Sequence, residues 1–156
     1  MARCVSWLLV ASLAITAAPV HAQSDEKAVI AVVNHFFDGM RTRDTALLRS
    51  IVVPSTVLST VPGQNGVIQP RTIDDFIGRI GKGTGPGGDE RMKNPKVQSD
   101  GELASLWAYF TYTRPGETKI NHCGIDEFLL RKSADGWKIF YVADTHRTEG
   151  CSPIKK

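Results

Sequence analysis

The chain has 156 residues, of which 42% are hydrophobic and 22% are charged, and its formal net charge is +3. This balance is that of an ordinary globular protein, and it excludes a disordered, collagen-like or low-complexity chain. The length suits one domain with its own core. The small positive charge gives no reason to expect nucleic acid or an anionic membrane as a partner.

Residues 1–22 are typical of a secretory signal peptide. Arg3 supplies the positive start, an apolar run follows from Cys4 to Ala18, and Val20 and Ala22 place small residues at −3 and −1 of a cleavage site after Ala22. The alternative is a membrane anchor, but the apolar run is shorter than the roughly 20 residues that a span needs. We therefore predict a periplasmic or secreted protein with no membrane contact after cleavage.

Removal of the signal peptide would leave two cysteines, Cys123 and Cys151, in the mature chain. Two thiols in an exported protein suggest one disulfide, which would tie the C-terminal tail, residues 148–156, to the body of the domain. The alternative is a pair of free thiols in a cytosolic protein.

The first half of the mature chain has the pattern of three helices and a short hairpin. An apolar stripe at helical spacing, proline and glycine turns, and a capping-box-like start mark these elements. They are a helix over 29–40 capped by Asp25, a short helix from Asp44 that ends at Pro54, a strand over 56–61 that turns back into 67–69, and a helix that opens at Thr72.

The second half has the pattern of long strands. Turn signals with Asp-Gly or Pro-Gly separate four runs of β-branched and aromatic residues, at 91–99, 103–113, 119–131 and 137–145. Pro95 marks a bulge or an edge. Strands of this length twist and curl. We therefore predict an α+β fold over residues 23–147: a cone-shaped, curved antiparallel sheet with three N-terminal helices packed on its concave face.

Five stretches, in this order, also resemble one known family. Ala31–Phe37 and Arg43–Leu48 are similar to its first two helices, Thr72–Ile80 to its third, and Gly124–Phe128 with Asp135–Ile139 to its last two strands. The family is the nuclear transport factor 2-like superfamily. It includes ketosteroid isomerases, scytalone dehydratase, SnoaL-like polyketide cyclases and a subgroup sometimes labelled lumazine-binding. The resemblance implies the same cone-shaped fold.

The cone implies an apolar pocket. Alternate residues of a strand share a face, so His122 and Phe128 point inward if Asp126 does. The resemblance turns three residues of the preceding strand inward, and the first helix would cap the cavity. The expected lining is Phe36, Met40, Thr60, Trp107, Tyr109, Thr111, His122, Asp126 and Phe128. Such a lining suits a small, flat, largely hydrophobic ligand.

Asp126 is the leading candidate for chemistry. Ketosteroid isomerases carry an acid at the matching place, which an apolar site keeps protonated so that it donates a hydrogen bond. The same desolvation would raise the pKa of Asp126. The isomerase tyrosine, however, falls on Phe36, and its carboxylate base falls on Thr60 or Ser59. We therefore predict no steroid isomerase activity.

His122 is a candidate for the missing base. It lies about 13 Å from Asp126 along the strand, so a ligand between them would touch both. The alternative is a structural histidine bonded to a neighbouring strand or to Tyr109. Asp126 could likewise only satisfy a buried hydroxyl.

Two weaker motifs have ordinary interpretations. Asp144 and His146 share a face near the end of the last strand; they are too few for a metal site, and we expect a solvated pair at the rim. Residues 83–88 match a glycine-rich dinucleotide motif in letters, but they follow a helix instead of opening one, so we expect a loop near the pocket mouth. We predict neither a metal nor a cofactor.

Three functions remain open. The favoured one is an exported module that binds a small apolar or aromatic molecule. The alternative is an enzyme of the dehydratase, isomerase or cyclase type, with Asp126 as the acid and His122 as the base. The third is a homodimer that presents its outer sheet to a protein partner, for which Ile125 and Leu129 are the motivating residues.

Overall fold

A computed structural model describes residues 20–62 and 66–154, with side chains from Asp25 onward. Its elements in chain order are α1 (Val20–Thr42), α2 (Thr45–Ser50), β1 (Val52–Val61), β2 (Gln69–Thr72), α3 (Ile73–Lys82), β3 (Asp89–Ser99), β4 (Leu103–Thr113), β5 (Ile120–Ser133) and β6 (Gly136–Thr145). Most of the expected signal peptide lies outside these residues. Its last three positions, 20–22, belong to α1.

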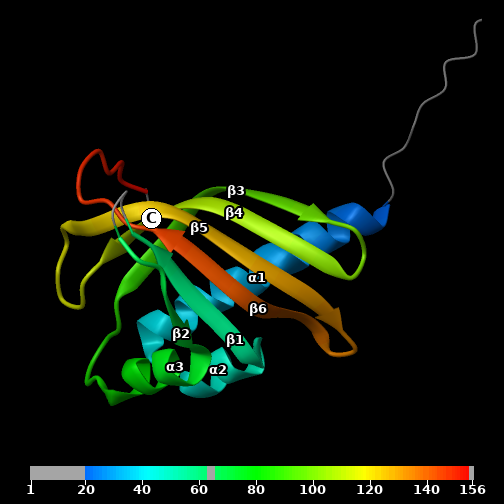
Figure 1. The fold of residues 1–156 in the computed structure, drawn as a ribbon, viewed down its shortest axis with the longest axis horizontal. Helices are drawn as coiled ribbons and strands as arrows, with labels where there is room; N and C mark the ends of the chain where they lie inside the picture. The colour runs from blue at the N-terminus through cyan, green and yellow to red at the C-terminus, as the bar shows by residue number, and fades with distance from the viewer. Residues whose placement is uncertain (1–19, 63–65, 155–156) are drawn as a thin grey trace, which may run out of the picture.

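One curved sheet holds all six strands, in the order β2-β1-β6-β5-β4-β3 (Figure 1). The predicted antiparallel meander of β3 to β6 is confirmed. The sequence did not predict the parallel pairing of β1 with β6, in which Val57 lies opposite Tyr141. This pairing joins the N-terminal half of the chain to the end of the meander.

The three helices cover one face of the sheet, as predicted. In Figure 1, α1 crosses behind the meander, whereas α2 and α3 lie beside β1 and β2. The core between the two layers is apolar and nearly inaccessible to solvent. Its most buried members include Val29, Val33, Phe37, Leu48, Ile77, Leu106, Leu130 and Ile139. The fold is thus α+β, with an unclosed, mostly antiparallel sheet.

The starts of the two short helices follow local rules. Asp44 caps α2 by accepting a hydrogen bond from the Leu47 amide at 2.8 Å. Thr72 caps α3 in the same way, with the Asp75 amide as donor at 3.1 Å.

The predicted end of α2 at Pro54 is wrong. The helix ends at Ser50, because Val52 and Val53 already favour a strand and Pro54 lies in the irregular first half of β1.

Asp25 is not the N-cap of α1, as the sequence suggested, because the helix extends back to Val20. Its side chain is buried and accepts a hydrogen bond from Lys132 Nζ at 2.8 Å and one from Trp137 Nε1 at 3.4 Å. Asp25 therefore ties α1 to the hairpin between β5 and β6.

The predicted irregularity at Pro95 is confirmed. The pairing of β3 with β4 shifts between Lys93 and Lys96, and Asn94 has a φ of 54°. A bulge of this kind increases the local twist of a strand and so helps to curl the sheet.

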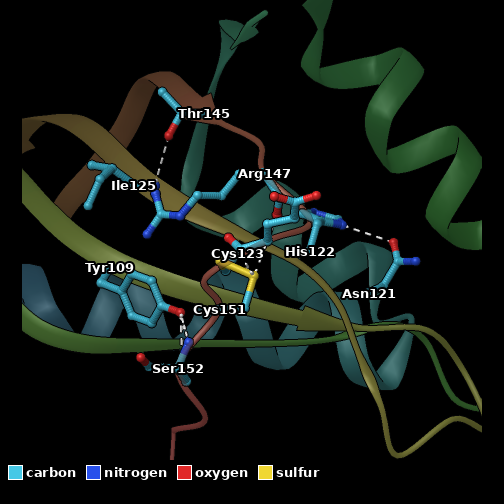
Figure 2. The surroundings of a disulfide bond; sticks show 10 residues. Tyr109, Asn121, His122, Cys123, Ile125, Thr145, Arg147, Cys151 and Ser152 are labelled. Carbon is cyan, nitrogen blue, oxygen red and sulfur yellow. Dashed lines mark hydrogen bonds between the residues drawn. A yellow bond between two sulfur atoms is a disulfide. The ribbon is translucent and has the colours of Figure 1, made fainter. Parts of the chain in front are cut away.

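The C-terminal tail lies over the outer face of the sheet. The predicted disulfide between Cys123 and Cys151 is present, with the Cα atoms 5.6 Å apart (Figure 2). The Tyr109 hydroxyl adds a second attachment, since it accepts from the Ser152 amide at 2.8 Å and donates to the Ser152 carbonyl at 3.1 Å.

Within the described part of the chain, no helix has the length and hydropathy of a membrane span.

Candidate functional site

A pocket of about 230 Å³ lies between the helices and one end of the sheet. The helices contribute only apolar side chains to it, whereas the titratable ones come from the strands and from His146, directly after β6. The helical lining is Phe36, Met40, Phe76 and Ile80. The strand lining is Leu58, Thr60, Gln69, Arg71, Glu90, Tyr112, His122, Asp126, Phe128, Val142 and Asp144.

Six of the nine residues expected in the lining border this pocket: Phe36, Met40, Thr60, His122, Asp126 and Phe128. The other three, Trp107, Tyr109 and Thr111, lie on the opposite face of β4. Paired residues of neighbouring strands share a face, and Ala108 is the residue opposite Asp126. The expected inward set was therefore displaced by one residue.

The three displaced residues have other surroundings. Trp107 is 51% exposed. Tyr109 holds the tail through Ser152, and Thr111 lies opposite Cys123 on the outer face. The correct inward residues of β4 are the buried Ala104, Leu106, Ala108 and Phe110, followed by Tyr112.

Asp126 points into the pocket and is 2% exposed. Its Oδ2 has no hydrogen-bond partner among the described residues. Burial, reinforced by the neighbouring carboxyls of Glu90 and Asp144, raises the pKa of Asp126 well above its ordinary value. This shift favours the protonated, uncharged form of Asp126, and its Oδ2 has hydrogen-bonding capacity left for a ligand.

Glu90, on β3, is a second acid that the sequence analysis missed. Its backbone carbonyl accepts a hydrogen bond from Arg41 Nη1 at 2.7 Å, and its carboxyl interacts with that of Asp126. Burial, followed by the charge of Asp144, raises the pKa of Glu90 to about 8. The expected strand began at Arg91. Extending it back by two positions from the inward Met92 would have placed Glu90 on the pocket face.

Asp144 and His146 contact each other in the pocket lining, through Oδ2 and Nε2. The expectation of a solvated pair at the rim holds only for His146, whose side chain is 46% exposed; that of Asp144 is 18% exposed. The hydrogen bond that His146 donates to the Asp144 carboxylate raises the pKa of His146. A carboxylate that orients an imidazole beside a cavity is an arrangement suited to proton transfer.

His122 lies between two other rings. Its ring centroid is 4.7 Å from that of Tyr112 and 4.2 Å from that of His146. Its Nδ1 is 3.0 Å from Asn121 Oδ1, and the Tyr109 hydroxyl, expected as a partner, bonds Ser152 instead. Burial, with the nearby charge of His146, lowers the pKa of His122 to about 4, so the imidazole is neutral at pH 7 and a weak base.

A close crossing of β5 and the end of β6 places His146 beside His122. A Cβ on Gly124 would lie 1.7 Å from the Thr145 carbonyl oxygen, so only glycine permits the approach. Cys123 and Arg147 then exchange two backbone hydrogen bonds of 2.9 Å. The disulfide and this bridge hold the segment that carries His146.

Glycine-rich residues 83–88 form a loop between α3 and β3, as expected. Arg43 holds the loop by donating to the carbonyls of Ile80 at 2.8 Å, Gly85 at 3.0 Å and Pro86 at 3.3 Å.

Among the residues whose side chains the structure describes, no group of three or more histidine, cysteine, aspartate or glutamate residues is placed to hold a metal ion.

No protein-family model and no curated protein matches the sequence. Solved structures do match. A nuclear transport factor 2-like protein with a cystatin-like fold from Novosphingobium aromaticivorans has a TM-score of 0.66 and 12% identity, over 83% of this chain and 86% of that one. A proposed dehydratase of the nuclear transport factor 2-like family from Streptomyces avermitilis has a TM-score of 0.61 and 14% identity, over 81% of this chain and 98% of that one.

A proposed aromatic ring hydroxylase from Novosphingobium aromaticivorans gives a similar result, with a TM-score of 0.63 and 17% identity over 80% of this chain and 90% of that one. Identities this low establish the fold alone. The helix order, the curled meander and these neighbours agree, and the chain has the nuclear transport factor 2-like fold.

Proposed function

We propose that the protein is an acid–base enzyme of the dehydratase or isomerase type, acting on a small and largely apolar molecule that carries a carbonyl or hydroxyl oxygen. The observation that carries the proposal is the Asp144–His146 pair, which borders the same pocket as two carboxyl groups with raised pKa values, Asp126 and Glu90. Groups with displaced pKa values that converge on one cavity are typical of catalytic sites.

The roles follow from the protonation states. Asp126 donates a hydrogen bond to the carbonyl oxygen of the substrate and stabilises the enolate that forms there. His146, in its neutral form and oriented by Asp144, accepts the proton from the adjacent carbon. In an isomerisation this proton returns to another carbon. In a dehydration Glu90 protonates the leaving hydroxyl, which departs as water.

The size of the pocket limits the substrate. Sites for drug-sized ligands are about 300–1,000 Å³, and this pocket is about 230 Å³. The ring of Phe36 stacks on that of Phe76 at 5.5 Å, which gives the pocket a flat apolar wall. We therefore expect a substrate of one or two rings. The proposed dehydratase among the similar structures is consistent with this reaction class.

A binding module without turnover is the second candidate, and one observation favours it. Thr60, at the position where the isomerases of the family have their base, carries no titratable group. His122 is a weak base. Without proton transfer by His146, the pocket would only hold its ligand.

Deuterium exchange separates these two candidates. Purified protein is incubated in D₂O with 2-tetralone and with 4-hydroxy-2-cyclohexenone, and loss of the exchangeable C–H signals is followed by NMR. We expect exchange above the buffer rate in the wild type, and a decrease of about 10²–10⁴-fold in Asp144→Asn and His146→Ala. Asp135→Asn, in the exposed turn before β6, is the matched control.

Two outcomes would decide against the enzyme. Ligand-induced line broadening without exchange in the wild type would favour the binding module. Equal exchange in wild type and Asp144→Asn would remove the pair from the mechanism.

We also propose export of the protein through the predicted signal peptide. The disulfide supports this, since such bonds persist in oxidising compartments. N-terminal sequencing of protein recovered from the periplasm should begin at Gln23; retention of residues 1–22 would contradict export.

The homodimer through the outer face of the sheet stays a prediction, and size-exclusion chromatography with light scattering tests it.

A further inference from the structure

We propose that the substrate carries a carboxylate, which Arg71 binds at the mouth of the pocket while the apolar part of the molecule points inward. This inference rests on the proposed function of the pocket. It adds a substrate class, an anionic cyclic or aromatic acid, to the reaction type.

Arg71 belongs to the pocket face of the edge strand β2. It lies opposite Leu58 of β1, and Gln69 lies opposite Thr60 in the same register. All four residues border the pocket. Arg71, Gln69 and Thr60 are exposed, whereas Asp126 is almost fully buried. The guanidinium is therefore at the solvent end of the pocket, and the Asp126 carboxyl is at its inner end.

Arg71 differs from the arginines near it in having no fixed partner. Arg41 donates to the Glu90 carbonyl, Arg43 holds the glycine-rich loop, and Arg91 donates to Asp89 Oδ2 at 3.0 Å. No hydrogen bond or ion pair joins Arg71 to another residue in the described part of the chain. Its five N–H donors are therefore available to a ligand.

No carboxyl group of the lining forms an ion pair with Arg71 among the described residues. The pKa values of Asp126 and Glu90 are raised, which favours their uncharged forms, and Asp144 contacts His146. Asp144 and Asp75 act on Arg71 only at longer range. A carboxylate on the ligand would complete the charge balance, and the planar guanidinium matches it through two parallel hydrogen bonds. The Gln69 side-chain amide, two residues away on the same face, supplies a further donor.

This arrangement orients the substrate. With its carboxylate on Arg71, a one- or two-ring molecule extends past Phe36 and Phe76 toward Asp126. The reacting oxygen then lies at the inner end of the pocket, away from bulk water. Arg71 is thus a binding and specificity residue, and it takes no part in the proton transfer.

Matched acids and amides test this inference. Dissociation constants are measured by calorimetry for 1-naphthoate against 1-naphthamide, and for cinnamate against cinnamamide. We expect each acid to bind about tenfold more tightly than its amide to the wild type, because a hydrogen bond to a charged group is worth about 1.5 kcal/mol or more. Arg71→Met should remove this preference, and Arg71→Lys should retain part of it.

Arg131→Met is the matched control. Arg131 is also an exposed arginine on a strand, near the C-terminal end of β5, but it does not border the pocket. It should keep the full preference for acids. Raising the salt concentration should weaken binding of the acids and leave the amides unchanged.

The outcomes separate this inference from the proposed function. Equal binding of acids and amides by the wild type, or a preference that persists in Arg71→Met, overturns the role of Arg71 and leaves the acid–base enzyme standing. Arg71-dependent binding of acids without deuterium exchange supports Arg71 and overturns the enzyme. Binding of neither class overturns both.

Discussion

The two ends of β5 have the same alternating pattern and serve different purposes. At one end, Leu130 lies opposite Ala104 and Ile139, and all three are at most 1% exposed. At the other end, His122 and Asp126 border a hollow. Both sets of side chains point to the helical face of the sheet. What differs is how completely the helices cover them.

The closed end is stabilised mainly by apolar contacts, and its buried carboxyl, Asp25, accepts hydrogen bonds from Lys132 and Trp137. At the open end, Asp126 Oδ2 has no hydrogen-bond partner in the described part of the molecule, and Glu90 lies beside it. Unsatisfied buried polar groups cost stability and are retained where they serve a ligand. Stability and chemistry are therefore separated along one strand, and replacing an inward-pointing side chain should change the free energy of unfolding in opposite directions at the two ends.

The largest effect is expected at the closed end. Leu130→Ala should lower the free energy of unfolding by about 2–5 kcal/mol, because it leaves a cavity among packed side chains. Urea titration followed by tryptophan fluorescence measures the loss. Leu129→Ala, on the outer face and only partly buried, should cost less and is the control. A loss below about 1 kcal/mol for Leu130→Ala would contradict the comparison.

The open end should depend on its covalent link more than on packing. The double substitution Cys123→Ala with Cys151→Ala should lower the free energy of unfolding by about 2–4 kcal/mol, since the disulfide closes a loop with a sequence separation of 28. Thermal unfolding of the variant and of the wild type, both without reductant, gives the difference. An unchanged midpoint would mean that Tyr109 and the Cys123–Arg147 backbone bridge suffice to hold the tail.

Removal of the buried acid should raise stability and abolish chemistry. Asp126→Leu replaces an unsatisfied polar group by an apolar one of similar size, and we expect a gain of about 1–3 kcal/mol in the free energy of unfolding. Urea titration measures the gain, and deuterium exchange should disappear. Asp126→Asn, which keeps the polarity, is the control and should gain less. A less stable leucine variant would show that Asp126 has a structural role.

The smallest effect is a pH dependence. Glu90 and Asp126 have folded-state pKa values above their ordinary ones, so the stability that their protonated forms contribute is lost as the pH rises through those values. His122 acts in the opposite sense, but only between about 4 and its ordinary pKa of 6.5. The midpoint of unfolding should therefore fall between pH 6.5 and about 8.

Glu90→Gln should flatten this fall by up to about 1.4 kcal/mol per pH unit, the value for one proton. His146, whose pKa is also raised, keeps part of the slope in the variant. Parallel stability curves for wild type and variant would contradict the raised pKa of Glu90. Asp135→Asn again serves as the control, because its carboxyl lies in an exposed turn.

Much of the fold was predictable because local signals agree. The bounds of β4 were predicted as Leu103–Thr113, since turn residues flank a run of β-branched and aromatic side chains. Which residues of β4 point to the helices was not predictable, because both faces of the strand carry large apolar or aromatic side chains. Trp107 and Tyr109 lie on one face, and Leu106 and Phe110 lie on the other. Alternation is uninformative where both faces carry such residues.

The site was less predictable than the fold. Asp126 and His122 could be placed by counting along one strand. Glu90 lies at the start of a strand whose predicted beginning was displaced by two residues. The placement of Asp144 and His146 depends on the crossing at Gly124 and on the tail, which are contacts between distant segments. Such contacts leave no periodic pattern in a single sequence.

The parallel pairing of β1 with β6 has a consequence for how the molecule is made. In the described part of the chain, β1 and β2 join the sheet through β6, the last of its six strands. Contacts between residues this far apart in the chain slow folding, because a long loop must be closed before they form. We therefore expect the wall of β1, β2 and α3 to enclose the pocket late in folding.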